Sequence, residues 1–155
     1  MKLHSFTGWS CAFKNHYGTT VKPSKLHPYS SLEGDYYTAD YSPFIDIYNN
    51  PHIGGKTILT VADGLFAAFN RHFPPKVWET FGNDYPKSLL FSTDPVAIDC
   101  VMGDLLTTEK PTVDPRAGDY LVLAANAGLG VHERGDPWGS GYSSIDYQKF
   151  ELDPI

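Results

Sequence analysis

Cysteines are scarce in this sequence, and their spacing excludes the common cysteine-ligated cofactors. The 155 residues contain two, Cys11 and Cys100, with no Cys-x-x-Cys pair. Local zinc and iron–sulfur sites use several cysteines or histidines at close spacing, so no iron–sulfur cluster is expected. Free cysteine is among the residue types most often buried, and we expect two buried thiols.

Long apolar runs and clusters of basic residues are lacking as well. No run approaches the roughly 18 apolar residues that a membrane helix needs, and residues 1–5 contain no apolar core of a secretion signal. The formal net charge is −6 and the Lys and Arg residues are scattered, whereas nucleic-acid binders cluster them to displace counterions from phosphates. We therefore expect a soluble chain, without an export signal of its own, that binds neither a membrane nor a nucleic acid.

Nucleotide-binding and nucleophile motifs are also missing. The chain contains no phosphate-binding P-loop, no Gly-x-Ser-x-Gly elbow and no kinase motif. The pair Gly128-x-Gly130 follows a predicted helix rather than a strand and lacks a third glycine, so it is not a dinucleotide fingerprint. No nucleotide cofactor is therefore expected.

What is present is the balance of a globular domain, with 41% hydrophobic and 14% aromatic residues. The length fits one core, and we predict a single domain over residues 1–155. Apolar β-branched runs predict strands, and amphipathic stretches with capping residues predict helices. The expected strands begin near residue 2 and at 56–62, 88–92 and 147–152, and the expected helices cover 7–17, 44–49, 95–107 and 119–127.

The runs at 56–62 and 88–92 define the predicted fold class. They are largely apolar without clear alternation, as in strands that are buried on both faces of a parallel sheet. Such strands alternate here with amphipathic helices. The sequence therefore predicts an α/β fold, a three-layer sandwich with a mostly parallel sheet.

Polar residues follow three of the predicted strands. His4 follows the first, Asp63 the second and Asp94 the third. Ligands of open parallel sheets bind beyond the carboxyl ends of the strands, so we expect these side chains to converge and hold a divalent metal ion. Each also has a purely structural interpretation: Asp94 as a helix cap, Asp63 as a turn residue and His4 as a hydrogen-bonded buried imidazole.

A second polar group lies near the end of the first predicted helix and consists of Lys14, Asn15 and His16. Together with Lys2, these residues are expected to bind an anionic group of a substrate. The alternative is that the cations complement the negative end of the helix dipole. Asp99, one turn into a later helix, has the corresponding structural interpretation at a positive helix end.

Several of these segments together resemble one large bacterial and archaeal family. The shared segments are Lys2-x-His4, Gly8 to Gly18 around Ala12-Phe13-Lys14-Asn15, Asp46-Ile-Tyr, Pro51-His-Ile, Lys56 to Gly64, Ser92-Thr-Asp-Pro-Val-Ala-Ile-Asp99, and Leu121 to Gly130. The family is known as domain of unknown function 362. The resemblance implies, without assigning chemical roles, that the positions to test are Lys2, His4, Lys14, Asn15, Asp63, Asp94 and Asp99. Relatives are often longer at the N-terminus and often exported, so the resemblance implies either a fragment that lacks an upstream portion or a short form of the family.

Three functional hypotheses result. The first is a metal-dependent hydrolase that acts on a small anionic substrate through a metal-activated water. Its metal ligands are His4, Asp63 and Asp94, its catalytic residues Asp63, Asp94 and Lys14, and its substrate-binding residues Lys2, Asn15 and His16. The second is a non-catalytic domain that holds a small molecule or a carbohydrate-like surface with the loop 28–48 and Trp78 or Trp138. The third is a structural domain of a larger assembly, including a homo-oligomer.

Overall fold

The structure is a computed structural model that describes residue 1 and residues 3–4, 8–9, 11–26, 40–68, 74–113 and 115–153. The strands in these ranges are β1 (Leu3–His4), β2 (Gly8–Trp9), β3 (Thr60–Gly64) and β4 (Ser88–Ser92). The α-helices are α1 (Pro43–Asn49), α2 (Pro95–Glu109) and α3 (Asp119–Asn126). Short 3-10 helices are η1 (Phe13–Thr19), η2 (Pro23–Leu26), η3 (Gly54–Lys56), η4 (Glu79–Phe81) and η5 (Pro115–Gly118).

The described strands form two separate two-stranded antiparallel sheets, β1 with β2 and β3 with β4. The prediction of a three-layer sandwich with a mostly parallel sheet is therefore wrong. A parallel pair requires a crossover connection between its strands, usually an α-helix. The described part of the connection from β3 to β4 contains only the short η4, and the chain doubles back so that Val61 lies opposite Phe91.

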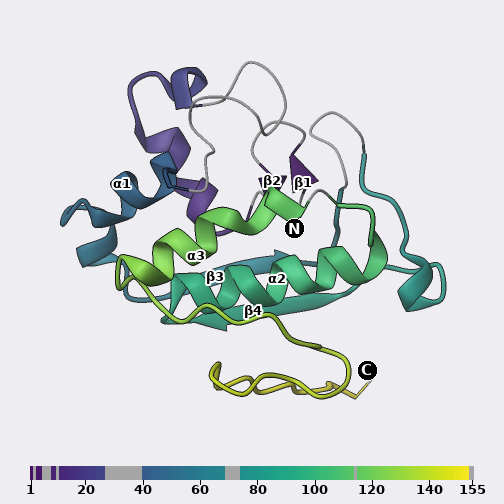
Figure 1. The fold of residues 1–155 in the computed structure, drawn as a ribbon. Helices are drawn as coiled ribbons and strands as arrows, with labels where there is room; N and C mark the ends of the chain where they lie inside the picture. Colours follow the sequence, from purple (N-terminus) through teal and green to yellow (C-terminus); the bar gives the residue numbers. More distant parts are fainter. Residues whose placement is uncertain are drawn as a thin grey trace.

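Helix α2 lies at the centre of the fold. Asp94 caps its first turn, and Pro95 occupies the first helical position, where a missing N–H costs nothing. Every residue from Val96 to Leu106 is buried, so this part of α2 packs on all sides rather than along one apolar stripe. Figure 1 shows α2 running alongside β3 and β4, with α3 on its other side.

Aromatic rings from η1, α1 and α3 fill the core beside α2. Phe13 packs against Tyr48 with ring centroids 4.2 Å apart, and Phe44 packs against Tyr120 at 4.6 Å. Such rings remove large apolar areas from water. The result is a well-packed wall behind η1, which positions the segment that contains Asn15 and His16.

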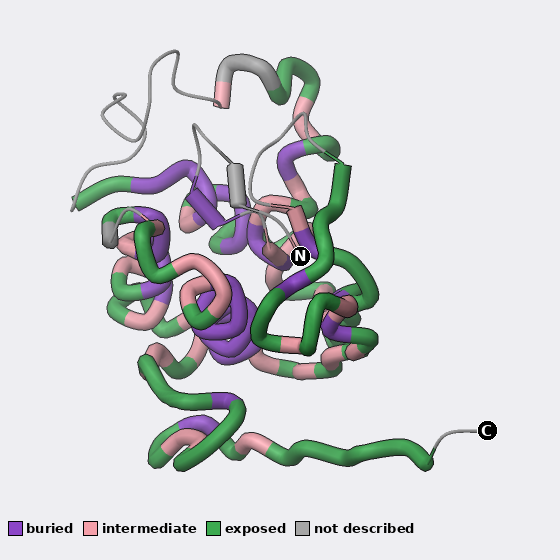
Figure 2. The backbone as a smooth tube through the Cα atoms, turned by 90° about the vertical axis from the view of Figure 1, so that its right-hand side faces the viewer, coloured by how far each residue is buried: buried purple, intermediate pink, exposed green. Residues whose placement is uncertain are grey.

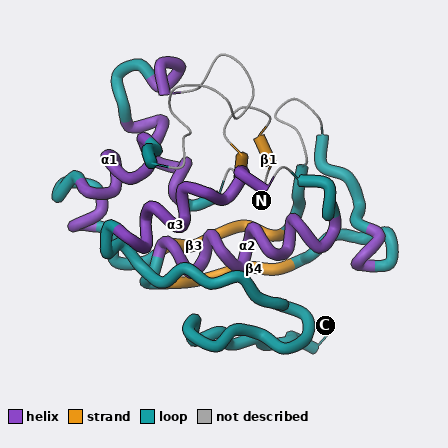
Figure 3. The backbone as a smooth tube through the Cα atoms, in the orientation of Figure 1, coloured by secondary structure: helices purple, strands orange, loops and turns teal. Residues whose placement is uncertain are grey.

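The C-terminal segment is made of loops rather than strands. Figure 3 shows it as loop below β4, and Figure 2 shows it as largely exposed, although Ile145 is buried against the core that α2 centres. Residues 147–152, predicted as an edge strand, belong to no strand. The turn before them is held by the Glu133 carboxylate, which accepts hydrogen bonds from the backbone N–H groups of Ser143 and Ser144 at 2.7 Å and of Ile145 at 3.0 Å.

Candidate functional site

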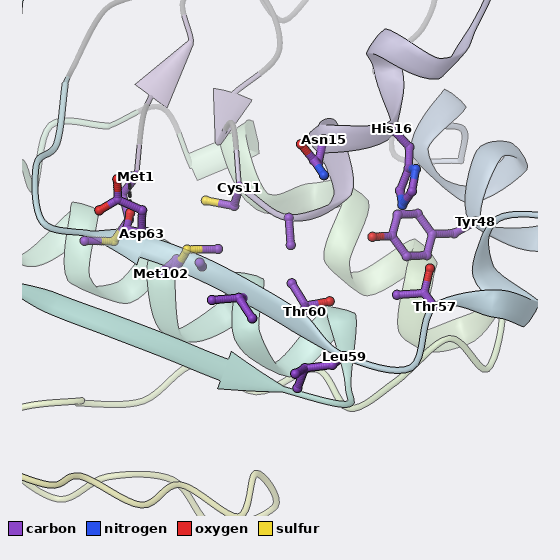
Figure 4. Close-up of a pocket in the computed structure, with 13 residues that line it drawn as sticks. Met1, Cys11, Asn15, His16, Tyr48, Thr57, Leu59, Thr60, Asp63 and Met102 are labelled. Carbon is purple, nitrogen blue, oxygen red and sulfur yellow. Dashed lines mark hydrogen bonds between the residues drawn. The ribbon is translucent and has the colours of Figure 1, made fainter.

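An open cleft of about 310 Å³ lies between β3 and the segment Cys11–His16 (Figure 4). This volume is near the lower end of the range for small-molecule sites, about 300 to 1,000 Å³. The polar residues that line it are Asn15, His16, Tyr48, Thr57, Thr60 and Asp63. Its apolar lining includes Met1, Leu59, Ala62 and Met102.

Asp99 holds the segment Cys11–His16, which forms one wall of the cleft, in place. Its fully buried carboxylate accepts hydrogen bonds from the backbone N–H groups of Ala12 at 2.6 Å and Phe13 at 3.1 Å. The Tyr120 hydroxyl donates a third hydrogen bond at 2.8 Å. Burial raises the pKa of the Asp99 carboxyl to about 7, against the opposing effect of these three donors. Asp99 is therefore a buried anchor that positions Cys11–His16, and it does not line the cleft.

One end of the cleft gathers polar groups with spare hydrogen-bonding capacity. The rings of His16 and Tyr48 meet edge to face with centroids 5.2 Å apart. In Figure 4 the Tyr48 hydroxyl points into the cleft between His16 and Thr57. Burial raises the pKa of Tyr48 to about 12, so its phenol is a neutral hydrogen-bond donor at physiological pH. No hydrogen bond from another described residue engages the side-chain polar groups of Asn15, His16 or Tyr48.

Asp63 occupies the other end of the cleft. Its side chain accepts a hydrogen bond from the backbone N–H of Leu65 at 2.6 Å, and its carbonyl accepts one from the Met1 amino group at 2.8 Å. The nearby Cys11 thiol has its pKa raised well above the usual value by burial and by Asp99, so it stays protonated and is a weak nucleophile. Figure 4 shows Asp63 and His16 at opposite ends of the cleft. The two side chains therefore do not act together as general acid and general base on the same substrate atom.

Asp94 is fully engaged with backbone donors away from the cleft. One carboxylate oxygen accepts hydrogen bonds from the N–H groups of Val96 and Ala97, both at 2.8 Å. The other accepts one from the N–H of Val131, also at 2.8 Å. Gly130 permits this contact, because a Cβ at that position would overlap the Asp94 side chain. Asp94 therefore caps α2 and ties the following loop to it, which is the structural alternative considered from the sequence.

The structure does not bring Asp63 and Asp94 together. Asp63 pairs with Leu89, whereas Asp94 follows Ser92, which pairs with Thr60. The two carboxylates are thus on the order of 15 Å apart along the strands, at about 3.3 Å per residue. Their expected convergence depended on parallel strands, and the antiparallel pairing removes it.

The predicted metal site accordingly has no geometric support among the described side chains. The described residues contain no group of three or more His, Cys, Asp or Glu side chains that could hold a metal ion. The side chain of His4 lies outside the described part of the chain, so its predicted role as a ligand stays a prediction.

The predicted anion-binding group is divided by the structure. Asn15 and His16 line the cleft together with Asp63. Lys14 does not line it, and its ammonium group lies 5.7 Å from the centre of the Tyr17 ring. Lys2 lies outside the described residues.

Sequence analysis missed Thr57 and Thr60 as cleft residues, and it included Tyr48 only as the last residue of the predicted binding loop 28–48. Tyr48 was visible within the Asp46-Ile-Tyr segment of the family resemblance, and the two threonines within the run at 56–62, which we assigned to a strand. The tryptophans proposed for ligand binding lie elsewhere. Trp78 is fully buried, and Trp138 packs against Phe81. Of the predicted binding loop 28–48, residues 28–39 lie outside the described ranges.

Comparison with known proteins identifies the family. The model of the family described as Domain of unknown function (DUF362) matches residues 1–104, about two thirds of the chain. The chain belongs to this family, which confirms the resemblance. No curated protein and no solved structure matches the chain. None of the helices in the described ranges is long and apolar enough to cross a bilayer.

Proposed function

We propose that the chain binds a small, uncharged molecule with several hydroxyl groups in the cleft between β3 and η1. The observation that carries this proposal is the set of unengaged polar groups of Asn15, His16 and Tyr48 along one end of the cleft. Tyr48 is buried, His16 is partly buried and Asn15 is exposed, so a complementary ligand would replace the contacts of these polar groups with water by direct hydrogen bonds. These three side chains therefore favour a ligand that both donates and accepts hydrogen bonds.

The remaining lining refines the class of ligand. The hydroxyl groups of Thr57 and Thr60 extend the polar end, while Leu59 and Met102 provide an apolar floor. A sugar or cyclic polyol matches this division, because its hydroxyl groups surround a ring with apolar C–H faces. This proposal develops the non-catalytic binding hypothesis: Tyr48, at the end of the predicted loop 28–48, lines the cleft, whereas Trp78 and Trp138 do not.

The charges that line the cleft favour a neutral ligand over the anionic substrate expected from the sequence. The described lining residues include the Asp63 carboxylate but no Lys or Arg side chain. The Met1 amino group lies beside that carboxylate and donates to the Asp63 carbonyl, so this end carries both charges, and no Lys or Arg side chain of the described lining offers an anion a fixed positive partner. Hydrolysis of an anionic substrate by a metal-activated water stays a prediction that depends on His4.

The test is a titration of the ¹⁵N-labelled protein with myo-inositol and glucose as neutral probes and inorganic phosphate as the anionic probe. We expect the neutral probes to shift the amide signals of Thr57 and Thr60 and the side-chain amide of Asn15, which line the cleft. Binding of phosphate without binding of either neutral probe would overturn the proposal.

A matched pair of tyrosine variants locates the binding site. Tyr48→Phe removes the hydroxyl that points into the cleft and keeps the ring that packs on Phe13. Loss of one hydrogen bond is expected to weaken binding of the neutral probe about five- to tenfold. Tyr85→Phe removes a hydroxyl from a ring that packs on Phe66 outside the cleft and should bind as the wild type does. Equal affinity of Tyr48→Phe and wild type would remove the cleft from consideration.

A further inference from the structure

Strand β3 has one edge paired with β4 and another edge that faces the cleft. Consecutive residues from Leu59 to Asp63 line the cleft along this second edge. In an antiparallel pair, the backbone N–H and C=O groups of successive residues point alternately toward the partner strand and away from it. The Asp63 carbonyl accepts a hydrogen bond from the Met1 amino group, so the backbone groups of Asp63 point away from β4. Those of Val61, two residues earlier, therefore point toward the cleft, whereas those of Ala62 point toward β4.

The backbone groups of Val61 on this cleft edge lack a partner among the described residues. No hydrogen bond from the rest of the described chain engages the N–H or C=O group of Val61, and the same holds for Leu59 just before the strand. Natural proteins usually cover or charge such an edge, because unpaired strand groups are a template for another strand. The cleft edge of β3 is thus available for pairing.

Met1 shows that backbone from outside β3 pairs with this edge. Its amino group donates to the Asp63 carbonyl at 2.8 Å and to the Phe66 carbonyl at 3.3 Å. Its own carbonyl accepts a hydrogen bond from the backbone N–H of Ala68 at 3.3 Å. Figure 4 shows Met1 beside Asp63 at one end of the cleft. The end of the edge is therefore occupied by backbone groups, and the part at Leu59 and Val61 is open to the cleft.

The geometry points to an extended peptide as the ligand of the cleft edge. We propose that a segment of another protein binds beside β3 as an added antiparallel strand, with one of its residues opposite Val61. An extended residue directs its own N–H and C=O groups to the same side, so it pairs with both groups of Val61 at once. In such strand addition, main-chain hydrogen bonds supply the affinity and alternate side chains supply the specificity.

The side chains beside the cleft edge define the class of peptide. Residues directly opposite each other on neighbouring strands place their side chains on the same face of the sheet. Leu59 and Val61, 52% and 56% exposed, lie on one face and favour a β-branched aliphatic residue, and the exposed Asp63 carboxylate ends this aliphatic surface. Thr60 and the small Ala62 lie on the other face and favour a hydroxyl side chain. The expected ligand therefore alternates Val or Ile with Thr or Ser.

This site adjoins the site proposed for the neutral ligand and does not depend on it. The peptide uses the side of the cleft that β3 forms, and the neutral ligand uses the end formed by Asn15, His16 and Tyr48. Peptide binding is measured without any sugar or polyol and with variants of a different element. Either proposal can therefore fail while the other holds.

The experiment titrates the ¹⁵N-labelled protein with the capped pentapeptide acetyl-Thr-Val-Thr-Val-Thr-amide up to about 2 mM, enough to detect a Kd of about 1 mM. In the free protein, the amide hydrogen of Val61 should exchange rapidly with solvent and that of Ala62 slowly, because only Ala62 is bonded to β4. The peptide should protect the Val61 amide. Slow exchange at Val61 without peptide, or no binding of the peptide, would overturn the proposal.

A matched pair of proline variants locates the bound peptide. Val61→Pro removes the N–H that points to the cleft and should weaken peptide binding about tenfold. Leu89 lies opposite Asp63 in the register, so its N–H points away from β3 on the far edge of the sheet. Leu89→Pro therefore removes an N–H of the same kind outside the cleft and should bind the peptide as the wild type does. Equal affinity of the two variants would contradict strand addition at β3.

A modified peptide tests the backbone hydrogen bonds without any change to the protein, which guards against proline variants that misfold. The same pentapeptide with every residue N-methylated on its backbone keeps the side chains and loses its N–H donors. It should not bind, because it can no longer donate to the Val61 carbonyl. Binding of the methylated peptide as tightly as the parent peptide would overturn the proposal.

Discussion

The polar side chains of α2 and those of the cleft differ in how completely they are hydrogen-bonded. Asp94, Asp99 and Asp104 follow one another at intervals of five residues, which turns each about 140° from the last around the helix. Each engages a different part of the chain. Asp94 accepts from Val131, Asp99 from Ala12, Phe13 and Tyr120, and Asp104 from Arg134, Gly135 and Tyr142.

In the cleft the situation is reversed. Asn15, His16 and Tyr48 stand at a concave surface, and the other described residues supply them with no side-chain hydrogen bonds. The comparison teaches that the carboxylates along α2 hold the fold, while the polar side chains at one end of the cleft are available to a ligand. Substitutions of the α2 carboxylates should lower the free energy of unfolding, and substitutions of the cleft side chains should lower the affinity for a ligand.

Asp99→Ala should have the largest effect on stability. The substitution leaves the backbone N–H groups of Ala12 and Phe13 and the Tyr120 hydroxyl buried without their partner. We expect the free energy of unfolding to fall by about 4 kcal/mol, measured by urea denaturation. Asp119→Ala, at the half-buried start of α3, is the control and should cost less than about 1 kcal/mol. Equal losses in the two variants would break the comparison.

Stability should also depend on pH through Asp99. Its folded pKa of about 7 lies above its ordinary value of 3.8, so the folded state holds the proton more tightly. The resulting stability is fully present below about pH 4 and is lost as pH rises through 7, with a change of about 2 kcal/mol between pH 5 and pH 7.

His132 gives the free energy of unfolding a pH dependence opposite to that of Asp99. Burial lowers its pKa, so its contribution is lost as pH falls. The difference in unfolding free energy between wild type and Asp99→Asn, measured at several pH values, therefore isolates the Asp99 carboxyl. A difference that does not change with pH would contradict a raised pKa for this group.

Asp94→Ala should have a smaller effect. It removes the cap from the first turn of α2 and the bond to the Val131 N–H. The expected loss is about 1 to 2 kcal/mol. Asp94→Asn keeps one acceptor oxygen for the cap and should recover much of that loss in the same urea titration. No recovery in Asp94→Asn would indicate that the charge, rather than the cap, is essential.

Asn15→Ala should have the smallest effect on stability. Asn15 is exposed, and within the described ranges its side-chain amide takes part in no hydrogen bond. We expect a change in Tm within experimental error, equivalent to about 0.5 kcal/mol or less. Binding of myo-inositol should weaken at the same time. A large loss of stability would place Asn15 with the carboxylates of α2 and undo the distinction.

The sequence located individual elements better than it paired them. The Asp94-Pro95 cap and the apolar runs at 56–62 and 88–92 predicted α2, β3 and β4 to within a few residues. These signals are local, because capping and side-chain pattern depend on neighbours in the chain. Strand direction depends on contacts between residues that are distant in sequence. The same apolar run is compatible with a buried strand of a parallel sheet and with a strand of an antiparallel pair that exposes apolar side chains on one face.

The candidate site was predicted in part for the same reason. Asn15, His16 and Asp63 were singled out from the sequence, and all three line the cleft. Asp94 was assigned to chemistry although its position before Pro95 already identified it as a cap. Tyr48 reaches the cleft only because α1 packs on η1, through the contact between Phe13 and Tyr48. Such packing has no signature in the local sequence.

The distinction between structural and ligand-binding polar groups is tested most directly by measuring Tm and the Kd for myo-inositol together, in wild type, Tyr48→Phe and Asp94→Asn. The account predicts that Tyr48→Phe binds about five- to tenfold more weakly at nearly unchanged Tm. Asp94→Asn should show a slightly lower Tm, because it keeps only one acceptor oxygen for the cap, with unchanged affinity. Unchanged affinity in Tyr48→Phe, combined with weaker binding in Asp94→Asn, would contradict it.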